Sequence, residues 1–364
     1  MTGVRISGTG IFPFGRHDVG LAEMGARVVK AALAEAGNPR IDGVFCGTAY
    51  GGVATGHRVL GMLGMTGVPI VDVEAGCASG AAALQLGADA IRSGRHGTVL
   101  VVGVEKMPKG VIRSSYFEPW REALGLTPAP AFFALRARRL MLDHGVTQQQ
   151  LAAVVVKNRA AGVDNPDAMF RKAVTVEDVL ASKLVCDPLH LFMLCSPNEG
   201  AAALVLQRGH AGVRLRACAL RSHRPGHVLD ESTPLAGLID EEPTPPATVA
   251  SQDAYEEAGL GPDDLDLVEC QDTDAAREVA LYGELGLCDP ADLDRFLEHG
   301  VPVNRSGGLL SKGEPLGASA VGQVVEIVRQ LEGRAGPRQV EGARVGLAQT
   351  IGRGANASVT ILST

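Results

Sequence analysis

The stretch Val71–Gly80, VDVEAGCASG, runs directly into AAALQLGADAIRSG and decides how the chain is interpreted. A short β-rich segment ends at Gly76, one cysteine follows, and small residues then open a helix. The N–H groups and dipole at a helix N-terminus favour an anion, so thiols placed there are more often reactive thiolates. We therefore predict that Cys77 is a nucleophile, and the alternative is an ordinary buried thiol.

The order of segments around this stretch occurs twice. Gly3–Phe12 (GVRISGTGIF) and Ile41–Ala49 (IDGVFCGTA) correspond to Gly212–Leu220 (GVRLRACAL) and Leu265–Thr273 (LDLVECQDT). The helix that follows Cys77 corresponds to Pro315–Arg334, PLGASAVGQVVEIVRQLEGR, which also opens with small residues. Strands and helices alternate in both copies, which indicates an α/β fold, and the matching order predicts a duplicated unit.

The duplication divides the chain into three parts. Residues 1–107 and 188–210 are expected to form the N-terminal half, and residues 211–364 the C-terminal half. Residues 108–187 have no counterpart and are predicted to be an inserted region that covers the site or binds substrate. Most of its basic residues are expected to face solvent and a minority to meet phosphates: Arg136, Arg138, Arg139, Lys157, Arg159, Arg171 and Lys172.

Composition narrows the functional class. The 364 residues carry a net charge of −7 with no long basic run, which argues against nucleic acid or an anionic membrane as partner. Hydrophobic residues make up 46% of the chain, aromatic residues only 4%, and 46 glycines allow backbones to pack closely. Seven scattered cysteines without a C-x-x-C pair indicate neither a disulfide framework nor a zinc site. With no signal peptide or apolar span, we expect a cytoplasmic protein.

These segments resemble the thiolase superfamily, in particular the branch of sterol-carrier-protein-type thiolases and bacterial lipid-transfer proteins. The resemblance covers essentially the whole chain and is carried by GTGIFPFGRHD, DVEAGCASGAAAL, CSPNEGAAALVL, VNRSGGLLSKGEPLGASAVGQVVEIVRQLEG and RQVEGARVGLAQTIGRGANASVTIL. It implies an α/β fold of two βαβαβαββ halves in five αβαβα layers, with an inserted loop domain. It also implies a homodimer that processes acyl-CoA thioesters, with coenzyme A thioester as substrate and neither a metal nor a covalently bound cofactor.

The resemblance also implies site residues. Cys77 matches the acylated nucleophile, and the backbone N–H groups of Cys77 and Gly352 match the family's oxyanion hole. The first departure from the family is in GEPLGAS, where Glu314 replaces the histidine of a Gly-His-Pro motif. Glu314 would then be a base, or a neutral acid that donates to an enolate; the alternative is a carboxylate paired with a neighbour such as Lys312.

Two further departures concern the remaining family blocks. The Asn-Glu-Ala-Phe or His-Asp-Ala-Phe block is QDTD in this chain, which places Gln271 and Asp272 in the site. Gln271 keeps an amide that can hold a water or an enolate oxygen. Asp272 is a candidate acid or base, but Asp272 and Asp274 are equally explained as caps of the following helix. The C-terminal cysteine is replaced in AQTIG by Thr350, which cannot act as a base.

We consequently predict an acyltransferase that makes or breaks a C–C bond at a thioester through acylated Cys77, with Glu314 as the altered acid/base group. One alternative is a retro-aldol lyase that acts on a bulky, steroid-like CoA ester without an acyl-cysteine. Another is a non-catalytic acyl-CoA-binding subunit. The resemblance further implies a small OB-fold and zinc-ribbon protein as partner. The acyl group itself is not identified by the sequence.

Overall fold

The structure is a computed structural model that describes residues 3–110, 123, 128–209, 211–222, 244–352 and 356–364. Its strands are β1 (Val4–Gly15), β2 (Gly43–Gly47), β3 (Ile70–Val73), β4 (Thr98–Lys106), β5 (Leu184–Cys186), β6 (Leu189–His190), β7 (Glu199–Arg208), β8 (Val213–Arg221), β9 (Leu267–Glu269), β10 (Val345–Ile351) and β11 (Ala357–Ser363). Its α-helices are α1 (Leu21–Glu35), α2 (Thr55–Gly61), α3 (Ser79–Arg92), α5 (Ala129–His144), α6 (Gln148–Val163), α7 (Val176–Ala181), α8 (Pro246–Ala258), α9 (Ala275–Glu284), α10 (Leu293–His299), α11 (Gly308–Lys312) and α12 (Leu316–Leu331).

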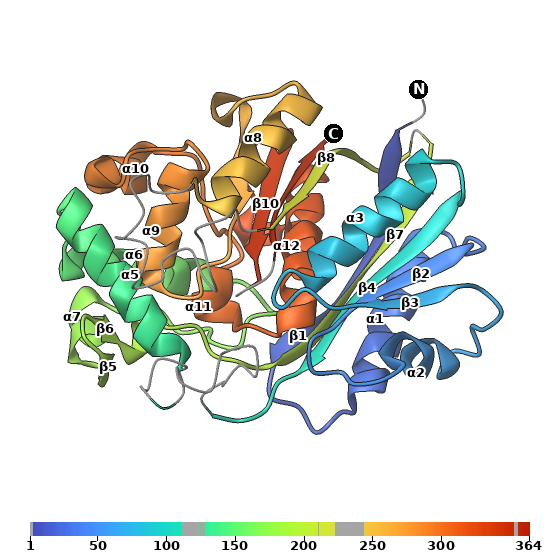
Figure 1. Ribbon diagram of the computed structural model, residues 1–364, viewed down its shortest axis with the longest axis horizontal. Coiled ribbons are helices and arrows are strands. Elements are labelled where there is room, and N and C mark those ends of the chain that lie inside the picture. The colour runs from blue at the N-terminus through green and yellow to red at the C-terminus, as the bar shows by residue number, and fades with distance from the viewer. Residues whose placement is uncertain (1–2, 111–122, 124–127, 210, 223–243, 353–355) are drawn as a thin grey trace.

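The strands of the two halves join in one large mixed sheet. Within the described residues its order is β3-β2-β4-β7-β1-β8-β11-β10-β9, and β5 pairs with β6 separately. The halves meet where β1 pairs with β8, through the short register Arg5 to Arg214 and Ile6 to Val213. Figure 1 shows the blue and cyan N-terminal strands on one side of this joint and the red C-terminal strands on the other.

Strand pairing repeats on the two sides of the joint. In the N-terminal half β2 pairs in parallel with β3 and β4, and β7 pairs antiparallel with β4 and β1. In the C-terminal half β9 pairs in parallel with β10, and β11 pairs antiparallel with β10 and β8. A parallel bridge from Val268 to Val303 takes the place of the β2–β3 pairing. The predicted duplication is confirmed.

Helices cover both faces of each half. The pair α3 and α12 lies between the two parts of the sheet and contacts both, as the centre of Figure 1 shows. Helix α1 packs on β1 and β7 from the other side, and α8 packs on β8 and β11. One apolar core joins Leu84 of α3 and Val324 of α12 to Leu204 and Leu362 of the two sheet parts. The predicted five-layer αβαβα fold is therefore confirmed.

Glycine allows the central layer to pack this closely. A Cβ atom on Gly103 of β4 would lie 2.4 Å from the carbonyl oxygen of Gly317, and one on Gly80 of α3 would lie 2.7 Å from the same oxygen. Real Cβ atoms do not approach backbone oxygens so closely. The glycine-rich, aromatic-poor composition thus serves the contact between α3, α12 and β4.

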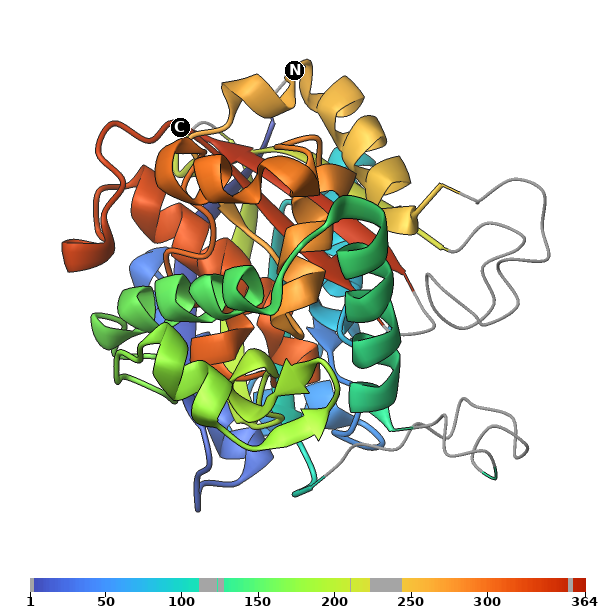
Figure 2. The same ribbon diagram turned by 90° about the vertical axis from the view of Figure 1, so that its left-hand side faces the viewer.

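Helices from the predicted insertion lie over the C-terminal half. Helix α5 packs against α9, and α6 packs against both α9 and α11. Figure 2 shows these green helices lying over the orange ones on the side that faces the viewer. Residues 111–122 and 124–127 of the insertion lie outside the described residues. Within the described part of the chain, no helix combines the length and the apolar composition needed to cross a membrane.

Candidate active site

Cys77 lies in the turn between β3 and α3. Strand β3 ends at Val73 and α3 begins at Ser79, so the cysteine precedes the helix by two residues instead of starting it. The backbone turns at Gly76, whose φ of +58° is a conformation that suits glycine. The Ser79 hydroxyl holds this turn, because its Oγ accepts the N–H of Ala75 at 2.9 Å and donates to the carbonyl of Gly76 at 2.6 Å.

The Cys77 side chain contacts residues of both halves. It is only 7% exposed and packs in an apolar group with Met107, Leu316 and half-buried Ala49. Met107 directly follows β4 of the N-terminal half, whereas Leu316 begins α12 of the C-terminal half. Glu314 is two residues before Leu316. The duplicated fold therefore brings the segments of the predicted nucleophile and the predicted acid/base group together, one from each half.

Glu314 is buried within a network of hydrogen bonds. It is 5% exposed, and its backbone N–H donates to the carbonyl of Ser196 at 2.8 Å. One carboxylate oxygen accepts from Nε2 of Gln271 at 2.7 Å, and the other accepts from the thiol of Cys195 at 3.1 Å. The Gln271 carbonyl in turn accepts the backbone N–H of Ile351. Glu314 and Gln271 are thus brought together as predicted, and both are held in fixed orientations.

Cys195 is a site residue that the sequence did not reveal. Burial, and next the charge of Glu314, raise the pKa of the Cys195 thiol well above its usual value, and the charges of Asp272 and Cys77 add to the effect. Cys195 therefore stays protonated and donates to Glu314. The two residues lie 119 positions apart. The only available signal was that Cys195 opens the CSPNEG segment, which by itself assigns no role.

Asp272 is completely buried next to this network. Its Oδ1 accepts the N–H of Leu309 at 2.6 Å, while its Oδ2 accepts the N–H of Leu310 at 3.1 Å and Nδ2 of Asn158 at 2.9 Å. Burial, followed by the charge of Glu278, raises the pKa of Asp272 well above its usual value. These contacts fasten the first turn of α11, the helix that leads directly to Glu314.

The two aspartates of QDTD therefore have different helix partners. Asp274 caps α9, since its Oδ1 accepts the N–H of Arg277 at 2.9 Å. Asp272 binds the N-terminal N–H groups of α11 instead, so capping of α9 is confirmed for Asp274 and was wrong for Asp272. The acid–base role of Asp272 stays a prediction.

Gly352 does not offer the expected open donor. Its N–H donates to the carbonyl of Asn356 at 2.9 Å, which continues the pairing of β10 with β11 beyond Ile351. This arrangement does not support the oxyanion role predicted for Gly352, because an oxyanion would have to displace Asn356.

Nearby, Thr350 donates to Oε1 of Gln323 at 2.6 Å, so its hydroxyl is used in packing α12.

The basic residues of the insertion separate into two groups. As expected, Arg138, Arg139, Arg171 and Lys172 are exposed. Arg136 and Lys157 instead pair with carboxylates, Asp274 at 2.6 Å and Glu278 at 2.5 Å. Arg159 is only 7% exposed, so the exposed residues are the majority and these three the minority.

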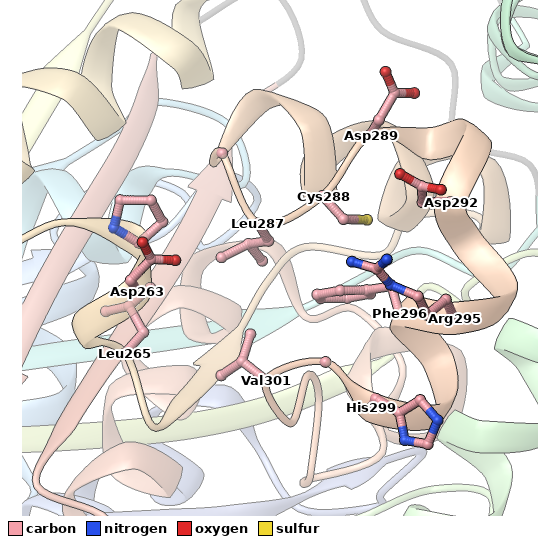
Figure 3. A pocket seen from close by; sticks show the side chains of 13 residues that line it. Asp263, Leu265, Leu287, Cys288, Asp289, Asp292, Arg295, Phe296, His299 and Val301 are labelled. Atoms are coloured by element: carbon pink, nitrogen blue, oxygen red, sulfur yellow. The ribbon is translucent and has the colours of Figure 1, made fainter.

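A pocket that is separate from this network lies on the C-terminal half. It is lined by residues that fall within 262–265 and 286–301, among them Cys288, Asp289, Asp292 and Arg295 (Figure 3). It includes none of the predicted site residues. No three His, Cys, Asp or Glu side chains of the described ranges gather as metal ligands would.

Comparison with known proteins agrees with this architecture. Residues 4–209 match the family description "Thiolase, N-terminal domain", and residues 240–364 match "Thiolase C-terminal domain-like". The chain is 36% identical over 393 aligned residues to an acetyl-CoA acetyltransferase of Methanothermobacter thermautotrophicus, and the match covers 100% of both chains. It is 33% identical to sterol carrier protein 2 of Bos taurus, over 91% of this chain and 66% of that protein.

A solved structure supports the fold independently. The "Ltp2-ChsH2(DUF35) aldolase" superposes with a TM-score of 0.85 and 23% identity, over 100% of this chain and 98% of that chain. At this identity the likeness concerns the fold. Together with the two domain matches and the full-length relative, it supports the resemblance drawn from the sequence. The chain belongs to the thiolase family, and sterol carrier protein 2 is among its relatives.

Proposed function

We propose that this protein is an acyltransferase that makes or breaks a C–C bond next to a CoA thioester through acylated Cys77, with Glu314 in place of the family histidine. The observation that carries the proposal is the buried Glu314 carboxylate, oriented by Gln271 and Cys195. It lies two residues from Leu316, which packs with Cys77. A carboxylate in that position can move the protons that the family's reaction requires.

In the proposed cleavage, Glu314 carries one proton at a time between the Cys77 thiol, the substrate and CoA, and it ends in its starting state. Glu314 accepts the proton of the Cys77 thiol, and the sulfur bonds to the β-carbon of a β-ketoacyl-CoA, which is its keto carbonyl carbon. The Cα–Cβ bond breaks, its electron pair goes to the α-carbon as an enolate, and that carbon takes the proton from Glu314. The thiol of a CoA then attacks acyl-Cys77, and its proton returns through Glu314 to the Cys77 thiolate. Condensation is the same sequence in reverse.

The charges of Glu314 and Cys77 explain how a carboxylate can act as the acid/base group of this site. An ionised Glu314 beside a Cys77 thiolate would place two like charges in a buried site, which is unfavourable. Transfer of the thiol proton to Glu314 leaves one negative charge instead of two. The neutral acid can then donate to the enolate, as carboxylic acids do in apolar sites. Gln271 and Asp272 are positioning residues in this proposal, because one orients the carboxylate and the other fastens α11.

A retro-aldol lyase is the second candidate. The observation that favours it is that Glu314 has an amide, Gln271, directly beside it, so a base and a hydrogen-bond donor are present without the cysteine. The solved neighbour named as an aldolase shares the fold. In this case Cys77→Ala would keep activity on a bulky, steroid-like CoA ester, whereas Glu314→Gln or Asp272→Asn would abolish it.

The proposal includes assembly in the cytoplasm. Strand β3 is at the edge of the sheet, and Val71 within it is 44% exposed, so its outer side is open to a second copy in a homodimer. The name of the solved neighbour, Ltp2-ChsH2(DUF35), joins two proteins, which supports a second, small acyl-CoA-binding partner for this chain. Acyl-CoA is the proposed substrate of the assembly.

Intact-protein mass spectrometry tests the covalent step. Wild type and Cys77→Ala are incubated with a panel of acyl-CoAs, with and without a candidate partner. A mass increase equal to the acyl group in wild type alone supports the acyltransferase. Turnover without an adduct, retained in Cys77→Ala, supports the lyase. Binding without adduct or turnover identifies a non-catalytic subunit and contradicts both candidates.

A further inference from the structure

Arg159 on α6 is a buried cation with an unusual environment. It is only 7% exposed, and its guanidinium carbon lies 4.3 Å from the ring centroid of Phe170 and 5.5 Å from that of Phe192. Its buried Nε has no hydrogen-bond partner. Within the described residues, no carboxylate pairs with it and burial alone accounts for its lowered pKa of about 10. Arg159 is therefore still a cation at neutral pH.

The protein treats its other buried cations differently. Within the part of the chain that the structure describes, Lys312, Arg277 and Arg338 are also buried, and each pairs with a carboxylate: Glu269 at 3.6 Å, Glu284 at 2.6 Å and Glu326 at 2.9 Å. A buried charge without a counter-charge is unfavourable. Two phenyl faces compensate only in part, since they accept none of the N–H donors in the plane of the guanidinium. An anion is the missing component.

The position of Arg159 connects it to the active site. Asn158, its neighbour on α6, donates to Asp272. Phe192 is three residues before Cys195, whose thiol donates to Glu314. The N–H of Phe170 donates to the carbonyl of Ser311, which is three residues before Glu314. All three segments around the guanidinium thus also hold the acid/base network.

We propose that Arg159 binds an oxyanion carried by the CoA thioester, which rests on the function proposed above. A guanidinium presents paired N–H donors that match carboxylate and phosphate oxygens. The oxyanion belongs to a carboxylate on the acyl group or to a phosphate of CoA. The closeness of Arg159 to the Glu314 network favours the acyl carboxylate, because the phosphates of CoA are at the far end of pantetheine from the thioester. Arg159 would then select acyl-CoA substrates with a second, ionised carboxyl group.

Equilibrium binding tests this inference independently of turnover. Glutaryl-CoA, valeryl-CoA and S-valeryl-pantetheine are titrated by calorimetry into wild type, Arg159→Met and Arg159→Lys. Arg171→Met is the matched control, because Arg171 directly follows Phe170, is exposed and bonds only the carbonyl of Val163 in the described structure. Loss of a charged hydrogen bond predicts roughly 10- to 100-fold weaker binding in Arg159→Met, with a smaller loss in Arg159→Lys. Thermal unfolding checks that each variant is folded.

The ligands distinguish the two sources of the oxyanion. A loss confined to glutaryl-CoA assigns the acyl carboxylate. An equal loss for both CoA thioesters but not for S-valeryl-pantetheine assigns a CoA phosphate. Unchanged affinities in folded Arg159→Met overturn the inference, and so does a wild type that binds none of the three ligands. If Arg159→Met does not fold, unchanged affinities in Arg159→Lys overturn it. Acylation of Cys77, measured by mass, reports separately on the proposed function.

Discussion

Among the single residues of the candidate site, Cys77 is the proposed nucleophile and Glu314 the proposed acid/base group. Glu314 accepts hydrogen bonds from a side-chain amide and a thiol, and both donors are themselves buried or locked. Because its thiol stays protonated, Cys195 acts as a fixed donor and does not compete with Cys77 as a nucleophile. Of the two thiols, Cys77 and Cys195, we therefore expect only Cys77 to react as a nucleophile.

Alkylation measures this difference. At pH 8.5 the raised pKa of Cys195 leaves almost no thiolate, so we expect iodoacetamide to modify it at least about tenfold more slowly than half-buried Cys186. The difference should narrow as the pH rises, because thiolate then forms at Cys195. In denaturant the two rates should converge, which is the control. Equal rates in the folded protein at pH 8.5 would contradict a protonated Cys195.

Among the helices and strands, the central helices depend on glycine where they contact the sheet. Gly103→Ala would press a methyl group against the carbonyl of Gly317, and two backbones cannot separate locally without moving α12. We expect this variant to lose about 3 kcal/mol of unfolding free energy. Gly61→Ala is the matched control: it lies in α2, nothing is within 4 Å of its Cβ position, and it should gain about 0.5–1 kcal/mol. Urea unfolding measures both, and equal effects would refute close packing at Gly103.

Much of the arrangement of helices and strands could be predicted from the sequence, because duplication repeats short local patterns in a recognisable order. The strand order of the two halves agrees with that repeated order, whereas the five layers were implied by the resemblance to thiolases. Side-chain contacts between residues far apart in the sequence could not be predicted in the same way. The bonds of Glu314 to Cys195 and of Asn158 to Asp272 join residues 119 and 114 positions apart, on segments that pattern alone does not bring together. Arg159 was named only as one of seven basic residues of the insertion, because the sequence does not show which of them is buried.

In the molecule as a whole, the two halves share one sheet and one core. Side chains of α3 and α12 pack together with strands from both halves, and β1 pairs with β8 across the joint. Neither half can unfold without exposing the apolar face of the other. The candidate active site lies between the two halves, where Leu316 of α12 packs with Cys77, so its integrity depends on the whole fold.

Calorimetry tests this coupling. We expect one cooperative thermal transition for the full chain, and a single transition shifted to lower temperature in Gly103→Ala. The loss of Cys77 acylation on heating should follow the same transition. Two resolved transitions in wild type would show that the halves unfold separately and would contradict a shared core.

The proposed function depends above all on proton transfer from Cys77 to Glu314, and the single-turnover rate of Cys77 acylation measures that step. Wild type, Glu314→Gln and Cys77→Ala are mixed with excess acyl-CoA and followed by mass spectrometry, with exposed Glu298→Gln as control. Loss of the proton acceptor predicts roughly 100-fold slower acylation in Glu314→Gln, none in Cys77→Ala and the wild-type rate in Glu298→Gln. Acylation of folded Glu314→Gln at the wild-type rate would show that Glu314 does not take this proton.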